Sequence, residues 1–193
     1  ALVYAYSNGM NDAANAIALV ISTRVLSPMA AVIMGSCFNL FGAVTGTAVA
    51  KTIGKGIIDP SQVNQMTVVA SIVAAVLWVI IATRKGIPVS VSHSLVASVL
   101  GAGLATAGFD GVNLVTASKV ILALGLSPLF GFCGGYIIMV VLYWIVRNSS
   151  QSTADKMFGK LQIAVGMFMC YAHGKNDAQN AMGIMALAWA VYY

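Results

Sequence analysis

The sequence predicts an all-α integral membrane protein, built as an inverted-topology repeat with broken helices and a re-entrant hairpin. The first observation is composition: 60% of the 193 residues are hydrophobic, 8% are charged, and the mean hydropathy is +0.90. A water-soluble domain carries about a quarter charged residues. The second observation is a polar pattern that occurs twice, and the third is the placement of basic residues between apolar runs. Together they predict a single transmembrane domain over residues 1–193.

Apolar runs follow one another along the chain, separated by short polar stretches. The predicted membrane segments cover residues 1–23, 29–50, 68–82, 88–108, 119–146 and 161–193. Glycines and a proline indicate turns in the polar stretch 51–65. Gly125 and Pro128 predict a break within the fifth segment. Residues 147–160 form the one plainly polar loop.

The repeated pattern is eleven residues long. Residues 6–16 read YSNGMNDAANA and residues 171–181 read YAHGKNDAQNA, with seven positions identical. At the positions that the copies share, each places one Asp and two Asn in an apolar stretch, where ionisable groups are costly and mark functional sites. The copies divide the chain into a first repeat, residues 1–146, and the start of a second, residues 161–193. A membrane protein with a duplicated polar motif is a candidate transporter.

Basic residues predict the orientation, because Lys and Arg are concentrated in cytoplasmic loops. With one crossing per apolar run, six basic residues share the cytoplasmic side: Arg24, Arg84, Lys85, Arg147, Lys156 and Lys160. Three lie opposite: Lys51, Lys55 and Lys119. The polar loop 147–160 is therefore predicted to be cytoplasmic, and the two motif copies run in opposite directions. Basic residues that lie singly or in pairs do not predict a nucleic-acid surface.

The motif carries ligands for a small cation. Asn11 and Asn15 are four residues apart and share a helix face, with Asp12 beside them. Carboxylate and amide oxygens suit Na⁺ or a proton rather than a soft transition metal. Asp12 and Asp177 are costly in an apolar interior unless they are protonated or paired with a cation. The alternative is that these side chains cap helices or join them by hydrogen bonds.

A second polar group, residues 87–98 (IPVSVSHSLVAS), lies in an apolar segment. Ser90, Ser92 and Ser94 do not share one helical face, which predicts an extended turn leading into a helix at about His93. Free backbone N–H groups, hydroxyls and a nearby His suit an anion. The alternative is a capped re-entrant helix whose hydroxyls satisfy its own backbone.

With these motifs the chain resembles the inorganic phosphate transporter (PiT) family, which is marked by GxNDxxNA-type signatures in both halves and a Pro-[ST]-Ser-x-[ST]-His-type loop after each. The first signature is matched by Gly9, Asn11, Asp12, Asn15 and Ala16. The second is matched by Gly174, Asn176, Asp177, Asn180 and Ala181, with His173 before them. The loop is matched by Pro88, Ser90, Ser92, His93 and Ser94. The second loop would lie beyond Tyr193, so we expect a fragment of a longer transporter.

The resemblance implies a secondary transporter that imports inorganic phosphate coupled to Na⁺ or H⁺, with no enzymatic activity and no organic cofactor. It implies a multi-pass homodimer in the lipid bilayer of the plasma or inner membrane. The implied cation ligands are Asp12, Asn11, Asp177 and Asn176, with the two aspartates as candidate Na⁺ ligands. The implied phosphate ligands are Ser90, Ser92, His93, Ser94, Asn15, Asn180 and Asn39.

Three other functions stay open at this point. A sulfate permease of the same superfamily would carry a similar tetrahedral oxyanion. A passive channel would also bring two inverted Asn-containing half-helices to the midplane, although an acid beside each Asn disfavours a neutral-solute pore. A structural subunit of a membrane enzyme would show no flux. Lys175, beside the second motif, either pairs with an anionic substrate or extends to the membrane surface.

Overall fold

The structure is a computed structural model that describes the backbone of residues 1–193 and every side chain except that of Lys156. The described chain is helical, and one isolated β-bridge joins Ile58 to Val112. The longer helices are α1 (Leu2–Ser22), α2 (Pro28–Val44), α4 (Gln65–Arg84), α5 (Val91–Ala107), α6 (Leu114–Val146) and α7 (Gln151–Tyr192). The short elements are α3 (Ala48–Lys51), the π-helical turn η1 (Thr52–Gly56) and the 3₁₀ turn η2 (Pro60–Gln62). The all-α prediction is confirmed.

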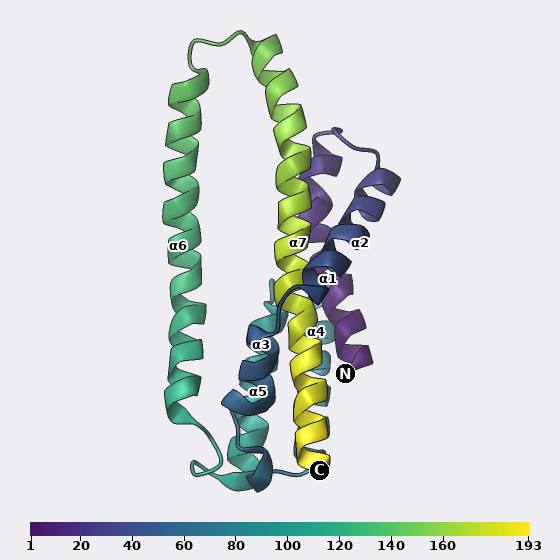
Figure 1. Cartoon of the computed structure of the whole chain (residues 1–193), viewed down its shortest axis with the longest axis vertical. Helices are drawn as coiled ribbons and strands as arrows, with labels where there is room; N and C mark the ends of the chain where they lie inside the picture. Colours follow the sequence, from purple (N-terminus) through teal and green to yellow (C-terminus); the bar gives the residue numbers. More distant parts are fainter.

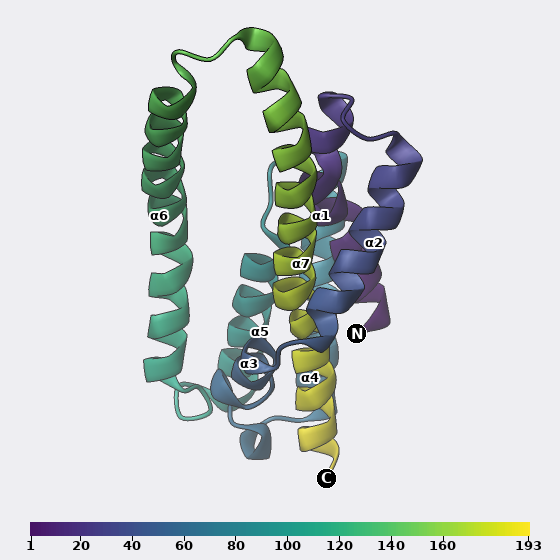
Figure 2. The same ribbon diagram turned by 45° about the horizontal axis from the view of Figure 1, so that its top comes forward.

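The two helices that carry the motif run in opposite directions along the long axis (Figures 1 and 2). The α1–α2 and α6–α7 connections lie toward one end of the molecule, and the α5–α6 connection lies at the other (Figure 1). Arg24 and Arg147 belong to the first two connections and lie toward the same end. The orientation in the membrane stays a prediction. The inverted repeat as a whole stays a prediction.

Helix length and composition identify the membrane segments. Helices α4 and α6 are long and apolar enough to span a bilayer, and α2 with the segment Ala48–Gly56 makes a third span bent by 57°. This bent pair is a broken helix, and it falls where the sequence alone predicts one continuous segment. Helix α2 ends at its C-cap Thr45, whose backbone N–H and hydroxyl both donate to the Gly42 carbonyl, and Gly46 follows before α3 begins.

Helix α5 corresponds to the unusual apolar segment 88–108 and returns alongside α4. The Thr67 hydroxyl at the start of α4 donates to that of Thr106 at the end of α5, 2.9 Å away, so the pair is antiparallel. With 17 residues, α5 is about 26 Å long, which is shorter than the roughly 30 Å hydrocarbon core. It begins two residues before the predicted start at His93, with Ser90 as its N-cap.

Two boundaries predicted from the sequence are wrong. Helix α6 is continuous through Pro128, because interrupting a helix in lipid exposes more backbone polar groups than the one N–H that proline lacks. The polar loop 147–160 is also mostly helical, since α7 begins at Gln151 with Ser150 as its N-cap. Its Gln, Ala, Lys and Met residues are good helix formers despite their polarity. Lys156, counted among the cytoplasmic charges, has its side chain outside the described part.

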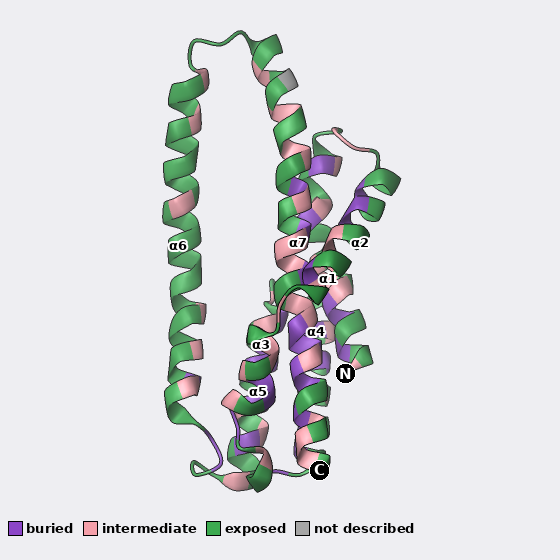
Figure 3. Ribbon diagram, viewed as in Figure 1, coloured by how far each residue is buried: buried purple, intermediate pink, exposed green. Residues whose placement is uncertain are grey.

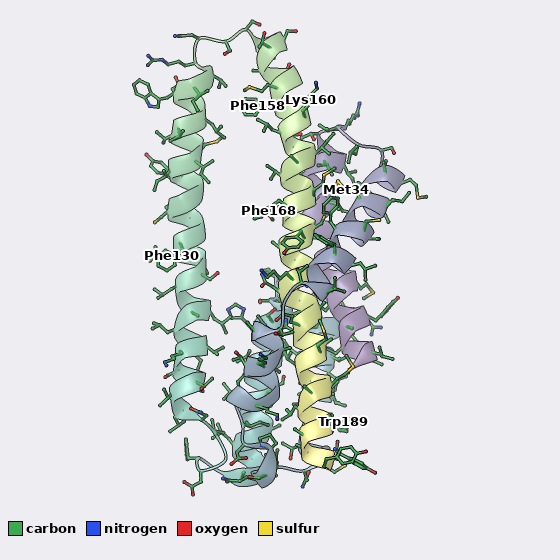
Figure 4. The ribbon with its side chains drawn as sticks, viewed as in Figure 1. Met34, Phe130, Phe158, Lys160, Phe168 and Trp189 are labelled. Atoms are coloured by element: carbon green, nitrogen blue, oxygen red, sulfur yellow. The ribbon has the colours of Figure 1, made fainter. Side chains whose placement is uncertain are left out.

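Helix α6 stands apart from the rest of the bundle and is exposed along almost its whole length (Figures 1 and 3). Its Phe130 and the Phe168 side chain of α7 are 70% and 67% exposed (Figure 4). Such large apolar side chains suit contact with lipid. Trp144 packs against Arg147 at one end of α6, and Trp189 lies at the opposite end of α7 (Figure 4). Aromatic residues at both ends match the two bilayer interfaces.

Candidate functional site

The two motif aspartates, which are far apart in the sequence, meet where α1 packs against α7. One ligand atom from each of Asp12, His173 and Asp177 lies within 4.8 Å of the others, and all three residues are half-buried. His173 and Asp177 are four residues apart on α7 and share a face, with Nε2 of the histidine 3.0 Å from Oδ2 of the carboxylate. The structure thus brings together the two predicted Na⁺ ligands and adds an imidazole between them.

The asparagines of the first motif hold one oxygen of the Asp12 carboxylate. Asn11 Nδ2 donates to Asp12 Oδ1 at 3.0 Å, and Asn15 Nδ2 donates to the same oxygen at 3.4 Å. Thr83 on α4 donates to Asn11 Oδ1 at 3.0 Å and fixes that amide in turn. Within the described residues, no hydrogen bond uses Asp12 Oδ2, so this second oxygen is available to a ligand.

Helix α2 fixes the orientation of the histidine. Asn39 Nδ2 donates to the Gly35 carbonyl at 2.7 Å, which leaves Asn39 Oδ1 facing His173 Nδ1 at 2.6 Å. Since a carbonyl oxygen only accepts, the proton of a neutral His173 sits on Nδ1. The Nε2 atom is then directed at Asp177. Asn39, which was included on the resemblance alone, therefore orients the imidazole in the structure.

A glycine makes this arrangement possible. A Cβ on Gly174 would overlap the backbone carbonyl of Asn39, and a Cβ on Gly42 would overlap the carbonyl of Tyr171. Helices α2 and α7 therefore cross at backbone contact, as small residues permit in membrane proteins. Gly9, the equivalent residue in the first motif, has nothing within 4 Å. The second motif's glycine is thus needed for packing, and the first motif's glycine has open space beside it.

A cavity of about 450 Å³ lies between α1, α2 and α7, next to the carboxylates. Its wall is largely apolar, and its polar lining comes from Asn8, Ser36, Asn39, His173 and Asp177. Asn8 is 5% exposed, and its Oδ1 has no hydrogen-bond partner. A mainly apolar pocket with a few convergent polar groups is the usual form of a small-ligand site.

The serine segment divides into two roles. Ser90 caps α5 by accepting from the His93 N–H at 3.3 Å, and its hydroxyl also contacts His93 Nδ1. The Ser94 hydroxyl donates to the Ser90 carbonyl at 2.8 Å. Both serines therefore satisfy the helix's own backbone, as the capping alternative predicts. Ser92 differs: its hydroxyl accepts from Asn180 Nδ2 at 2.8 Å, which joins the start of α5 to the second motif.

Comparison with known proteins decides the family. The sequence model of the phosphate transporter family matches residues 8–193. The chain belongs to the phosphate transporter family. A relative from Bacillus subtilis strain 168, named "Probable low-affinity inorganic phosphate transporter", is 41% identical over 97% of this chain and 57% of its own length. Relatives of the same name from Rhizobium meliloti and Mycobacterium tuberculosis are 37% and 35% identical, over 56% and 46% of their own lengths.

The fold has a solved counterpart. A structure titled "The sodium-dependent phosphate transporter" matches with a TM-score of 0.73 at 22% identity, over 96% of this chain and 64% of that one. The chain thus has the fold of that structure and is a multi-pass membrane protein of the family. It spans about half the length of the curated relatives it matches. Their names are those of transporters, in agreement with the prediction of a non-enzymatic protein.

Some predicted ligands of this family member lie outside the cluster. Asn176 is exposed on α7, and no hydrogen bond joins it to the cluster within the described residues. His93 is exposed beside Ser90. Lys175 is exposed, with Nζ 6.0 Å from the centroid of the Tyr171 ring, and is placed to extend outward. The binding roles of Asn176 and His93 stay predictions.

Other residues near the site were not predicted as ligands. Tyr4 is fully buried, one helical turn before Asn8, and a tyrosine in an apolar run gives no distinctive sequence signal. Gln179 is 2% exposed, and its Oε1 accepts from the backbone N–H groups of Val49 and Ala50 at 2.8 and 3.3 Å. It thereby caps the start of α3. Gln179 stands where the first copy has Ala14. This difference between the two copies is the sequence signal that could have identified it.

Proposed function

We propose that this chain is the part of a secondary transporter that binds inorganic phosphate together with Na⁺ or H⁺ and imports both across the membrane. One observation carries the proposal: the aspartates of the two motif copies, on antiparallel helices, converge with His173 beside a cavity. Two carboxylates in one half-buried site repel each other and favour a compensating positive charge. The site therefore binds the cation and the anionic substrate together, because the cation offsets the charge of the carboxylates.

The cation occupies the space between Asp12 and Asp177. Asp12 Oδ2 is free of protein hydrogen bonds among the described residues, and Asn11 and Asn15 hold the opposite oxygen in place. Oxygen ligands of this kind suit Na⁺. Asn11 and Asn176 are the remaining proposed cation ligands. A proton serves in place of Na⁺ if it is carried between His173 and Asp177, whose facing atoms are 3.0 Å apart.

Phosphate binds where α5 begins. Its N-terminal N–H groups suit an anion, and the contact between Ser92 and Asn180 places this helix end against the second motif. The proposed ligands are Ser90, Ser92, His93, Ser94, Asn15, Asn180 and Asn39. Sulfate fits the same geometry less well, because phosphate can donate a hydrogen bond to an acceptor and the site supplies carboxylates and an imidazole. These acids also disfavour a passive pore for neutral solutes.

Transport proceeds by rocking one repeat against the other around this fixed site. The relatives are about twice as long as this chain, so the whole cycle belongs to the full-length protein. We expect that protein to work as a homodimer in the lipid bilayer. Two places could allow such a motion without unfolding a helix: the four residues that connect α6 to α7, and the 57° bend after α2.

The test is labelled phosphate uptake by full-length protein in proteoliposomes, with an inward Na⁺ gradient, a pH gradient, or neither. We expect uptake to need one gradient and to be lost in Asp12→Asn and Asp177→Asn. The matched control is Asp155→Asn, an exposed acid on α7 outside the site, and it should behave as wild type. Uptake that ignores both gradients contradicts the coupled mechanism, and strong competition by sulfate moves the substrate assignment to that anion.

A further inference from the structure

Unpaired buried polar atoms are concentrated at one place in the molecule. Among the described residues, four buried side-chain atoms have no hydrogen-bond partner: Tyr4 Oη, Ser7 Oγ, Asn8 Oδ1 and His173 Nε2. The histidine nitrogen faces the Asp177 carboxylate at 3.0 Å as an ion pair, so the three atoms on α1 are the ones without any polar contact. All four belong to the two motif helices. Buried polar groups in native proteins almost always have partners, and an unsatisfied one costs about 1–3 kcal/mol. Such a cluster points to a polar ligand of the site rather than to the packing of the helices.

Tyr4 is the most fully enclosed of these residues. It is 0% exposed, and its ring belongs to the hydrophobic core that contains Ala181 and Ile184 of α7. Its hydroxyl lies beside the Asn180 side chain and within electrostatic reach of Asp12 and Asp177. A buried tyrosine hydroxyl normally finds a partner. Here the apolar ring holds the hydroxyl near the Asn180 side chain and the two motif aspartates, while the hydroxyl has no hydrogen-bond partner by distance and angle.

We propose that the Tyr4 hydroxyl is a ligand of the transported oxyanion and donates a hydrogen bond to one of its oxygens. The neighbouring amide supports this assignment, because Asn180 Nδ2 is already used by Ser92. The hydroxyl thus stands next to the contact that joins the second motif to the N-terminus of α5. A phenol is a good donor, and an oxyanion offers acceptors on every side. This inference rests on the proposed function of phosphate transport.

The alternative is that Tyr4 matters only as a core residue. In that case its ring provides packing, and its hydroxyl is tolerated at a cost in stability. The two readings differ in what Tyr4→Phe does. Removing an unpaired buried hydroxyl while keeping the ring should leave the folded protein equally stable or more stable. If the hydroxyl is a ligand, by contrast, its removal weakens phosphate binding and does not destabilise the phosphate-free protein.

The experiment uses full-length wild type, Tyr4→Phe and the control Tyr6→Phe. Tyr6 is on the same helix and 74% exposed. We would measure the KM for phosphate and the Na⁺ concentration giving half-maximal uptake in proteoliposomes, and the melting temperature in detergent with and without inorganic phosphate. For Tyr4→Phe we expect a KM raised about tenfold or more, as for loss of a hydrogen bond to a charged group. Phosphate should also stabilise this variant less, with the phosphate-free melting temperature unchanged or higher.

Each other outcome has a definite meaning. A Tyr4→Phe variant with a normal KM and normal stabilisation by phosphate overturns the proposal at any melting temperature. An unchanged or higher melting temperature then marks a hydroxyl that is merely tolerated in the core, and a lowered one marks a structural hydroxyl. A normal KM with a shifted Na⁺ requirement also overturns it, because the hydroxyl then serves the cation. Failure of wild-type protein to take up or be stabilised by phosphate would instead reject the proposed function, and that result is visible before any variant is compared.

Discussion

Replacing Gly174 with alanine should separate two helices that meet at backbone contact. The new Cβ would overlap the carbonyl oxygen of Asn39 and lie 2.6 Å from its Cα, and ordinary contacts begin at 3.4 Å, so α2 must move by more than about 0.8 Å. A shift of this size lengthens the Asn39–His173 hydrogen bond from 2.6 Å to more than about 3.4 Å, beyond the normal range. The imidazole then loses the contact that orients it toward Asp177.

The energetic cost follows from these contacts. Overpacking costs about 1–3 kcal/mol, a lost hydrogen bond about 1 kcal/mol, and alanine returns about 1 kcal/mol of helix propensity. We therefore expect Gly174→Ala to destabilise the protein by about 1–3 kcal/mol and to reduce phosphate uptake. Thermal unfolding of full-length protein in detergent, followed by circular dichroism, measures the first effect. Proteoliposome uptake measures the second.

The first motif supplies the control. Gly9 has nothing within 4 Å among the described residues, so Gly9→Ala should keep or slightly raise the stability of this half of the protein. A Gly174→Ala variant as stable as wild type would refute the steric reasoning. So would a full-length Gly9→Ala variant in detergent that is as destabilised as Gly174→Ala, because the two glycines would then share a requirement unrelated to α2.

Three further predictions concern side chains around the site. Gln179→Ala should leave two backbone N–H groups of α3 unsatisfied and cost about 1–3 kcal/mol in thermal unfolding, whereas Gln151→Ala, an exposed change on the same helix, should be close to neutral. Asn39→Ala should remove the hydrogen bond that orients His173 and lower the rate of phosphate uptake in proteoliposomes. The helix content measured by circular dichroism should stay unchanged. Hydrogen bonds from the Ser61 hydroxyl and N–H hold the pKa of Asp59 below its ordinary value of 3.8. Its stabilisation of η2 is therefore present above pH 3.8 and lost as the pH falls through the lowered pKa, which amide exchange at Ser61 would detect.

The convergence of the motif copies could be predicted from the sequence, because charge cost and repetition are both visible there. Two aspartates in apolar segments need compensation, and the structure brings Asp12 and Asp177 together with His173. The start of α5 was predictable for a similar reason, since proline and spaced serines indicate a capped helix. Ser90 is that cap.

Other features depend on tertiary contacts that a single sequence does not reveal. Nothing local distinguishes Ser92, which pairs with Asn180, from the backbone-capping Ser94. The burial of Tyr4 follows from how α1 crosses α7, not from its neighbours in the chain. The break predicted at Pro128 is wrong for a physical reason. Proline ends helices in water, where the freed carbonyls bind solvent, but lipid offers these carbonyls no partner.

The four-residue connection between α6 and α7 affects how the protein enters the membrane during synthesis. Helix α6, with a mean hydropathy of 2.2 over its most apolar window, can partition into lipid by itself. Helix α7 carries His173, Lys175 and Asp177, and each charged group at mid-membrane costs about 2.5–3.5 kcal/mol on insertion. Residues 147–150 connect the two helices. The favourable partitioning of α6 into lipid therefore offsets part of the cost of inserting α7. Asp12 on α1 precedes α7 in the chain, so the cluster of Asp12, His173 and Asp177 is completed only when α7 has entered the membrane.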